Sequence, residues 1–409
     1  MNTTTRFVVM VFTYALALRL LVVFGALPKF HSDVDLDSYR SLARNLAAGS
    51  GFIAPTPDGR ELPSVARTPT YPLFLAALIR FGGDRLDLFL AAQCLLGALT
   101  AALTAALATR WFRPHVSLLA GLLVAVDPNS VLRCADLRTE TLFTLLLLSG
   151  VCLVASPSAK KPNWLAAGIL WSVAALARPI AIWIWLVPII VIGVARVSWR
   201  DKAVAVALFL IGFCPLLGIW IARNHSLTGR CFVSTISTYN LLMYRAAGIE
   251  AELHHRQLDD VQRDFLARYG DIQFVDDQSH FQQSLADYQH AALDTIRSSP
   301  FILAKQTAIG WGKLLLGPGT RALEYSLAES KPVSKFWPPL YSLVLLTIAA
   351  FAVVGARRLG RDSILLVLLV LYFVVLAGGP ESNSRFRVPV TPMLAVLAVV
   401  GTCGVEKKP

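Results

Sequence analysis

The chain has 409 residues, of which 55% are hydrophobic and only 16% are charged, and its formal net charge is +12. A soluble domain of this length carries more charge, so these values exclude an ordinary soluble protein. The basic residues fall in small clusters between long apolar runs, which is typical of short cytoplasmic loops and not of a nucleic-acid-binding surface. The sequence therefore predicts an all-α polytopic membrane protein with no nucleic-acid partner.

Ten apolar runs are predicted to cross the membrane. The first follows Met1–Arg6, and its length favours an uncleaved span over a signal peptide. If Arg6 lies inside, every basic cluster between spans also lies inside, which predicts that both termini are cytoplasmic. The predicted spans are 7–27, 87–109, 116–132, 139–157, 164–178, 180–196, 203–221, 338–356, 362–378 and 388–404.

Two further apolar stretches fit this topology only if they do not cross the membrane. Residues 301–316 contain two lysines, and a span there would move the basic cluster 357–361 to the outside. Residues 71–81 are too few to span. Both stretches are therefore predicted to be interfacial or re-entrant helices on the outer face.

Two long segments between spans, about 28–86 and 222–337, are predicted on the outer face, whereas the inner loops are short. Within the second, a polar helical stretch is predicted from 250 to 297. The chain thus divides into an N-terminal transmembrane module (1–221), the outer segment 222–337 and C-terminal transmembrane helices (338–409). Function is expected on the outer face.

An acidic cluster, Asp33, Asp35 and Asp37, follows the first span. Ser38–Ala48 has the spacing of a short amphipathic helix, which two glycines end. Either Asp37 or Ser38 is well placed to cap its N-terminus, so capping and catalysis are both open for Asp37. Asp35 has no local helical function, and a base near the membrane surface is the functional alternative.

Several arginines lie at the outer ends of predicted spans, against the positive-inside pattern. They are Arg178, Arg223, Arg385 and Arg387. Arg67 precedes a proline-stiffened stretch, where it either contacts lipid headgroups or holds a phosphate. The guanidinium fork matches phosphate oxygens, so this set predicts an anionic partner.

Two other charged residues fall within or at predicted spans. Glu140 opens the fourth span, where the helix dipole favours an acid, but a carboxylate facing a bundle is costly and favours a functional role. Arg19 lies inside the first span and is expected to snorkel outward or to pair with a carboxylate. The histidines lack zinc-site spacing, so no metal site is predicted.

The motifs run in a fixed order along almost the whole chain. They are Asp35 with Tyr39, Ala43–Leu46 through Gly51 and Phe52, Arg67–Pro72, Glu140–Phe143, Leu176–Pro179, Trp220 with Arg223 and Asn224, and Arg385–Pro389. Together they resemble the GT-C superfamily of membrane glycosyltransferases that use lipid-linked sugars. The resemblance is to the branch with the protein O-mannosyltransferases, the aminoarabinose transferases and the bacterial family-39-like transferases.

The resemblance implies a GT-C-like fold and transfer of a sugar from a polyprenyl-phosphate-linked donor, by inverting displacement with an aspartate base. Relatives place the catalytic Asp four residues before a Tyr, which selects Asp35 ahead of Tyr39. Many relatives have Asp-Glu there, whereas this chain has Asp35 and Leu36, which leaves Asp37 as a second candidate. Glu140 matches an acidic residue that opens the fourth span, with the role of orienting substrate or supporting Asp35.

The resemblance also implies residues for phosphate and substrate binding. Donor phosphate binding is expected from Arg67, Arg178, Arg385 and Arg387. Further substrate contacts are expected from Tyr39, Tyr71, Arg138, Arg223 and Asn240. Some relatives are helped by a divalent metal, and the sequence leaves this dependence open here.

The acceptor stays open between a glycolipid, a polysaccharide and a protein, and an envelope glycolipid or polysaccharide is favoured because protein-modifying relatives commonly carry extra soluble domains. The expected location is the inner (plasma) membrane, with the lipid bilayer as a partner and the active site on the outer face. Two alternatives stay open: a transporter or flippase of lipid-linked glycans, and a noncatalytic envelope-assembly subunit. A transporter explains the outward arginines but not two large outer segments with minimal inner loops.

Overall fold

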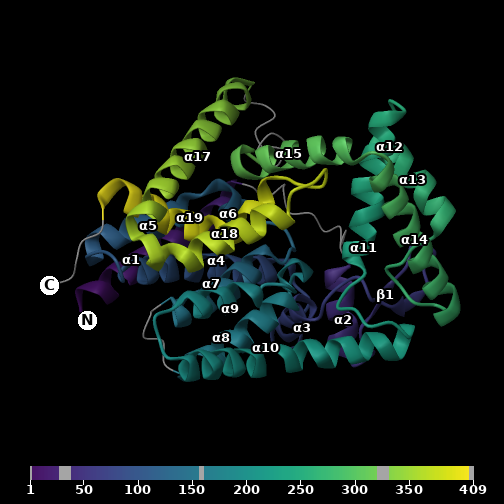
Figure 1. Ribbon diagram of the computed structural model, residues 1–409, viewed down its shortest axis with the longest axis horizontal. Coiled ribbons are helices and arrows are strands. Elements are labelled where there is room, and N and C mark those ends of the chain that lie inside the picture. Colours follow the sequence, from purple (N-terminus) through teal and green to yellow (C-terminus); the bar gives the residue numbers. More distant parts are fainter. Residues whose placement is uncertain (1, 27–37, 156–160, 320–330, 405–409) are drawn as a thin grey trace.

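The computed structural model describes residues 2–26, 38–155, 161–319 and 331–404. These residues are almost entirely helical (Figure 1), which confirms the predicted all-α class. The first half contains α1 (Thr3–Leu20), η1 (Leu21–Ala26), α2 (Tyr39–Ala48), β1 (Ile53–Pro55), β2 (Glu61–Pro63), α3 (Thr70–Gly82), α4 (Leu86–Ala108), α5 (Pro114–Val126), α6 (Pro128–Leu132), α7 (Glu140–Val154), α8 (Lys161–Ala175), η3 (Pro179–Ala181) and α9 (Leu186–Val194). The second half contains α10 (Trp199–Thr228), α11 (Ile236–Asn240), η4 (Leu241–Ala246), α12 (Ala247–Leu253), α13 (Leu258–Tyr269), α14 (Gln278–Ser298), α15 (Pro300–Leu316), α17 (Lys331–Leu359), η5 (Gly360–Ser363), α18 (Ile364–Leu376), η6 (Ser384–Val390) and α19 (Thr391–Cys403).

Each predicted span coincides with helical structure, although the helices differ in length. Within the described residues, five stretches are long and apolar enough to cross a membrane by themselves. They are Thr3–Gly25, Leu86–Ala108, Trp199–Thr228, Phe336–Leu376 and Ser384–Cys403. The helices at the other predicted spans, α5, α7, α8 and α9, are shorter than a bilayer-crossing helix requires.

Two predicted elements are interrupted in the structure. The predicted span 116–132 breaks at Asp127, whose Oδ2 accepts a hydrogen bond of 2.8 Å from the Ser130 amide and so caps α6. Pro128 takes the first helical position of α6, where its missing N–H costs nothing. The polar stretch 250–297 is helical as predicted, but turns divide it among α12, α13 and α14.

Glycines allow two helix pairs of the bundle to approach closely. A Cβ atom on Gly355 of α17 would lie 1.8 Å from the Leu397 carbonyl oxygen of α19, and one on Gly401 would lie 1.9 Å from the Phe351 oxygen. Gly168 of α8 makes the same kind of contact with α10. Small residues at helix crossings are typical of membrane bundles, in which packing replaces the hydrophobic effect as the main source of association.

A Gly355→Ala substitution is therefore expected to lower stability by about 1–3 kcal/mol, because the added methyl group meets backbone atoms that cannot rotate away. Gly218→Ala in α10 is the matched control, since nothing lies within 4 Å of its added Cβ atom. Thermal unfolding of the purified protein in detergent measures both variants. An unchanged unfolding temperature for Gly355→Ala would contradict the close crossing of α17 and α19.

Arg19 is completely buried in α1, so the expectation that it snorkels outward is wrong. The alternative, a carboxylate partner, stays a prediction, because the acidic cluster at 33–37 lies outside the described residues. Its Nη1 donates to the carbonyl oxygens of Ala15 and Ala125, each at 3.1 Å, and its Nη2 donates to that of Val124 at 3.2 Å. Val124 and Ala125 lie in the last turn of α5, whose carbonyl groups have no partner within that helix. Arg19 thus caps the C-terminal end of α5 by donating hydrogen bonds to its last carbonyl groups.

The predicted short helix after the first span is confirmed as α2. It ends at Gly49, which has the left-handed φ of +81° that favours glycine. Its polar face binds Asp84 through Arg40, with an Nε to Oδ1 distance of 2.8 Å, and through Arg44. Ser38 occupies the N-cap position, but its side chain makes no capping hydrogen bond, so the prediction of a Ser38 cap is wrong.

The two long segments between spans pack together through main-chain hydrogen bonds. The Val65 amide donates to the Gln273 oxygen at 3.0 Å, and the Thr235 amide donates to the Val65 oxygen at 3.1 Å. In Figure 1, α11–α14 stand beside α2 and β1 at one end of the molecule, and both termini lie toward the other end. We call α2, β1, β2 and α11–α14 the interspan unit.

Candidate functional site

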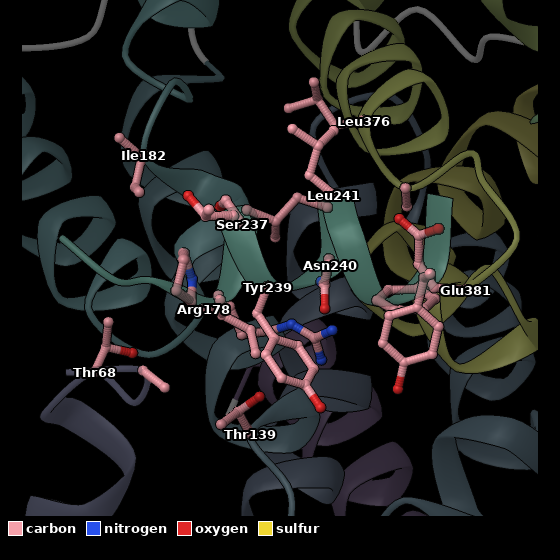
Figure 2. Close-up of a pocket in the computed structure, with 18 of the residues that line it drawn as sticks. Thr68, Thr139, Arg178, Ile182, Ser237, Tyr239, Asn240, Leu241, Leu376 and Glu381 are labelled. Atoms are coloured by element: carbon pink, nitrogen blue, oxygen red, sulfur yellow. The ribbon is translucent and has the colours of Figure 1, made fainter. Parts of the chain in front are cut away.

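A cavity of about 960 Å³ lies between the helical bundle and the interspan unit. Figure 2 shows side chains from distant parts of the chain converging on it. Its walls come from the start of α2, residues 66–68, the start of α7, the turn after α8, helices α11, η4 and α14, and the stretch after α18. Such a volume at the junction of two units is typical of a ligand-binding site.

One side of the cavity holds an ion cluster formed by the buried Glu140 and the partly exposed Arg178 and Arg385. Glu140 is the first residue of α7 and only 2% exposed. Its Oε1 lies 2.6 Å from Arg178 Nη1 and 4.0 Å from Arg385 Nε. A carboxylate held between two guanidiniums is a weak base, so its geometry suits the role of orienting the arginines.

Aromatic rings hold the two arginines in place. The guanidinium carbon of Arg178 lies 5.5 Å from the ring centre of Phe386, and that of Arg385 lies 5.0 Å from the same centre. Arg178 also lies over Phe143, at 5.8 Å. These cation–π contacts fix the two guanidiniums at the cavity wall without neutralising their charge.

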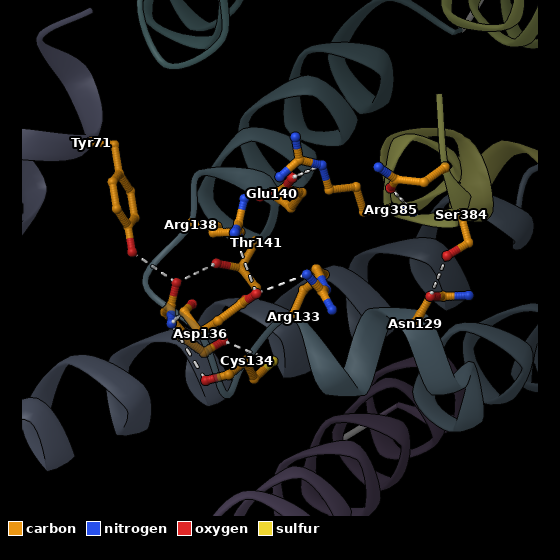
Figure 3. Close-up of polar contacts among 12 residues, drawn as sticks. Tyr71, Asn129, Arg133, Cys134, Asp136, Arg138, Glu140, Thr141, Ser384 and Arg385 are labelled. Atoms are coloured by element: carbon orange, nitrogen blue, oxygen red, sulfur yellow. Dashed lines mark hydrogen bonds and ion pairs between the residues drawn. The ribbon is translucent and has the colours of Figure 1, made fainter. Parts of the chain in front are cut away.

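The loop that leads into α7 is fixed by a buried polar network, shown in Figure 3. Asp136 Oδ2 lies 2.7 Å from Arg133 Nη1 and 3.1 Å from Arg138 Nε. Gln93, fully buried in α4, donates to the Asp136 carbonyl oxygen at 2.8 Å and accepts from the Tyr71 hydroxyl at 3.0 Å. Burial raises the pKa of Asp136 even though Arg133 opposes that shift. The network positions Arg138 and Glu140.

The structure brings many of the predicted site residues together. Seven of them line the cavity: Tyr39, Arg67, Arg138, Glu140, Arg178, Asn240 and Arg385. The guanidinium of Arg67 lies over the ring of Tyr39, at 5.5 Å from its centre. Asp35 and Asp37 lie outside the described residues, but in sequence they precede Tyr39 by four and two residues.

Three predicted site residues have other contacts and do not line the cavity. Tyr71 is fully buried and binds Gln93. Arg223 donates to the carbonyl oxygens of Ser64 and Phe52, at 2.7 and 3.3 Å. Arg387 is buried and donates to three carbonyl oxygens at the end of α15, those of Leu314, Leu315 and Gly317. Each of the three therefore joins elements of the fold, and none of them faces the cavity.

The cavity also contains an ion pair that sequence reasoning did not assign. Arg245 of η4 lies 3.3 Å from Glu381, which follows α18. Glu381 lies four residues before Arg385 in the sequence, and that proximity was the available signal. The sequence gives no such signal for Arg245, because arginines are common in polar segments and do not by themselves indicate a site.

No group of three or more His, Cys, Asp or Glu side chains in the described part of the chain could hold a metal ion. Glu140 and Glu381, which line the cavity, are each paired with an arginine. The described residues thus do not fit a metal centre, and the dependence on a divalent metal stays open, as it was from the sequence.

Residues 66–239 match the family model described as dolichyl-phosphate-mannose-protein mannosyltransferase. This range includes Arg67, Glu140 and Arg178. A comparison with curated proteins finds no significant match.

Solved structures share the fold at low sequence identity. The archaeal oligosaccharyltransferase AglB from Archaeoglobus fulgidus, in complex with an inhibitory peptide and a dolichol-phosphate, is 12% identical with a TM-score of 0.58; the match covers 97% of this chain and 50% of AglB. The apo form of the A. fulgidus enzyme gives 11% identity and a TM-score of 0.54, with 96% and 50% coverage. The chain thus spans about half the length of these enzymes.

A third structure is ArnT from Cupriavidus metallidurans bound to undecaprenyl phosphate, at 15% identity and a TM-score of 0.43, with coverage of 95% of this chain and 77% of ArnT. The family model and the archaeal structures agree with the resemblance seen in the motifs. The chain has the GT-C fold, which it shares with the archaeal oligosaccharyltransferase.

Proposed function

We propose that this protein is a glycosyltransferase that moves a sugar from a polyprenyl-phosphate-linked donor to an acceptor hydroxyl at the outer face of the membrane. The observation that carries this proposal is the pair of guanidiniums, Arg178 and Arg385, held against the cavity by Glu140 and Phe386. Guanidiniums fixed in a partly buried site are suited to a phosphate, because their N–H groups match its oxygens and carry the opposite charge.

An apolar rim beside these arginines provides room for a lipid chain. Ile180, Ile182 and Trp183 come from the turn that follows Arg178, and Leu376 is the last residue of α18. Figure 2 shows Ile182 and Leu376 on the same upper side of the cavity. Trp183 is 57% exposed, a large apolar surface at the rim. A ligand with a phosphate head and a polyprenyl tail fits a charged wall next to an apolar rim.

The chemistry assigned to this site is a single displacement. The acceptor oxygen attacks the anomeric carbon, a base removes the acceptor proton, and the bond between that carbon and the phosphate oxygen breaks. The electron pair leaves with the phosphate, whose growing charge Arg178 and Arg385 would stabilise. Attack opposite the leaving group inverts the configuration of the sugar.

Asp35 is the proposed base. It precedes Tyr39 by four residues, and Tyr39 lines the cavity. Glu140 would support the reaction by holding the phosphate-binding arginines.

The location and the acceptor belong to the same proposal. The positive-inside pattern supports cytoplasmic termini in the inner (plasma) membrane and an outward-facing cavity. The acceptor would be an envelope glycolipid or polysaccharide. In a strain that lacks the gene, mass spectrometry of envelope lipids and glycans is expected to show the loss of one sugar substituent, and an unchanged envelope would contradict the proposal.

Donor binding can be tested directly with undecaprenyl phosphate. Arg385→Gln is expected to weaken its binding to the purified protein about tenfold or more, because a charge-assisted contact to the phosphate is lost. Arg256→Gln is the control, since Arg256 pairs with Asp264 on α13 and does not line the cavity. Native mass spectrometry of the protein with the lipid measures both. Equal binding by wild type and Arg385→Gln would remove Arg385 from the donor site.

A further inference from the structure

The cavity has a second wall, whose residues are not part of the proposed donor site. It is formed by Asn240, Tyr244 and Arg245 from α11 and η4, by Gln289 from α14, and by Glu381 after α18. We call these five residues the amide wall. In Figure 2, Glu381 lies on the opposite side of the view from Arg178, and Asn240 lies between them.

The charged pair of the amide wall is arranged asymmetrically. Arg245 Nε and Nη2 both donate to the same oxygen, Glu381 Oε1, each at 3.3 Å, and Nη2 also donates to the Gly378 oxygen at 3.1 Å. The other carboxylate oxygen, Glu381 Oε2, is buried and has no hydrogen-bond partner in the described part of the chain. A buried acceptor without a donor is costly, and rotation of the Glu381 carboxylate toward the cavity would let a ligand hydroxyl remove that cost.

The net charge of the amide wall separates it from the donor side. Arg245 and Glu381 neutralise each other, whereas the donor side presents two guanidiniums, Arg178 and Arg385, beside Glu140. A second phosphate would therefore meet the carboxylate of Glu381 without a surplus of positive charge. The charge distribution favours a neutral ligand at the amide wall.

The remaining groups of the amide wall both donate and accept hydrogen bonds. Asn240 and Gln289 each offer an amide oxygen and an amide NH₂, and Tyr244 offers a hydroxyl. Sugar hydroxyls also donate and accept, so they can use every one of these groups. A peptide that binds by adding a strand needs a sheet edge, and the described residues of this wall are helical or in a loop.

We propose that the amide wall is the acceptor subsite and that it takes a neutral, hydroxyl-rich headgroup, namely a sugar. This inference rests on the proposed glycosyltransferase function, because it assigns the second substrate of the same cavity. Glu381 would accept a hydrogen bond from one hydroxyl of the acceptor, and Arg245 would hold Glu381 in position.

The test uses the full chain in phosphatidylcholine nanodiscs, which contain no sugar detergent. The probes are maltose, glucose 1-phosphate, a short serine-containing peptide and undecaprenyl phosphate. Saturation-transfer NMR is expected to show that wild type binds maltose in preference to glucose 1-phosphate and the peptide. Glu381→Gln is expected to weaken maltose binding about tenfold, because a hydrogen bond to a charged acceptor is lost, while undecaprenyl phosphate still binds.

Glu252→Gln is the matched control, because Glu252 also pairs with a cation, Lys305 at 2.8 Å, but does not line the cavity. Unchanged maltose binding by this control supports the assignment. Retained undecaprenyl phosphate binding shows that Glu381→Gln is folded. If wild type binds undecaprenyl phosphate but prefers the peptide or glucose 1-phosphate over maltose, the acceptor inference is overturned and the proposed function stands. If wild type does not bind undecaprenyl phosphate, the donor assignment itself fails.

Discussion

Asp35→Asn is expected to stop sugar transfer while the protein still folds and inserts into the membrane. Asparagine keeps the size and polarity of the side chain but cannot remove a proton from the acceptor hydroxyl. Loss of a general base costs about 10²-fold or more in rate. The measurement is the restoration of the missing envelope sugar in the deletion strain, with protein abundance in the membrane fraction measured alongside.

Asp37→Ser is the control for this experiment. Ser38 holds the N-cap position of α2 in the structure, which places Asp37 one residue before the cap. Serine at position 37 keeps a short polar side chain and removes the carboxylate. If Asp35 is the base, Asp37→Ser keeps most of the activity. Normal transfer by Asp35→Asn, or a large loss in Asp37→Ser at unchanged abundance, would move the base from Asp35 to another carboxylate.

The sequence predicted the helical class and several cavity residues because both depend on local patterns. Apolar runs predict the membrane helices, and a charged residue at the end of such a run is easily recognised as a candidate site residue. Glu140, Arg178 and Arg385 were found in this way, and all three line the cavity. Helix α8 ends at Ala175, and Pro179 begins η3 directly after Arg178, which fixes the backbone of the turn.

Other parts of the site depend on contacts that no local pattern contains. Arg245 and Glu381 are 136 residues apart in sequence, and only the packing of the interspan unit on the bundle brings them together. Arg385 and Arg387 are two residues apart in η6, so they point in different directions. One faces the cavity and the other binds the end of α15. The sequence predicted both arginines to bind the donor phosphate, because it does not show in which direction each side chain points.

Arg178→Lys is expected to lower the rate of transfer about 10²- to 10³-fold with a much smaller effect on folding. Lysine keeps the positive charge that balances the buried Glu140, but it loses the planar fork that contacts both the carboxylate and a phosphate. It also loses the stacking on Phe386. Removal of one group that stabilises charge on the leaving phosphate has effects of this size in enzymes that work by electrostatic stabilisation.

Glu140→Gln separates this effect from a purely structural one. It removes the counter-charge of Arg178 at a position that is only 2% exposed, so it leaves a largely buried guanidinium, 11% exposed, without its carboxylate. Breaking a buried pair in this way costs about 3–5 kcal/mol, and the expected result is low abundance and a lower unfolding temperature. Arg178→Lys should instead show near-normal abundance with slow transfer. If both variants lose abundance equally, the cluster serves the fold; if Arg178→Lys transfers normally, the phosphate is bound elsewhere in the cavity.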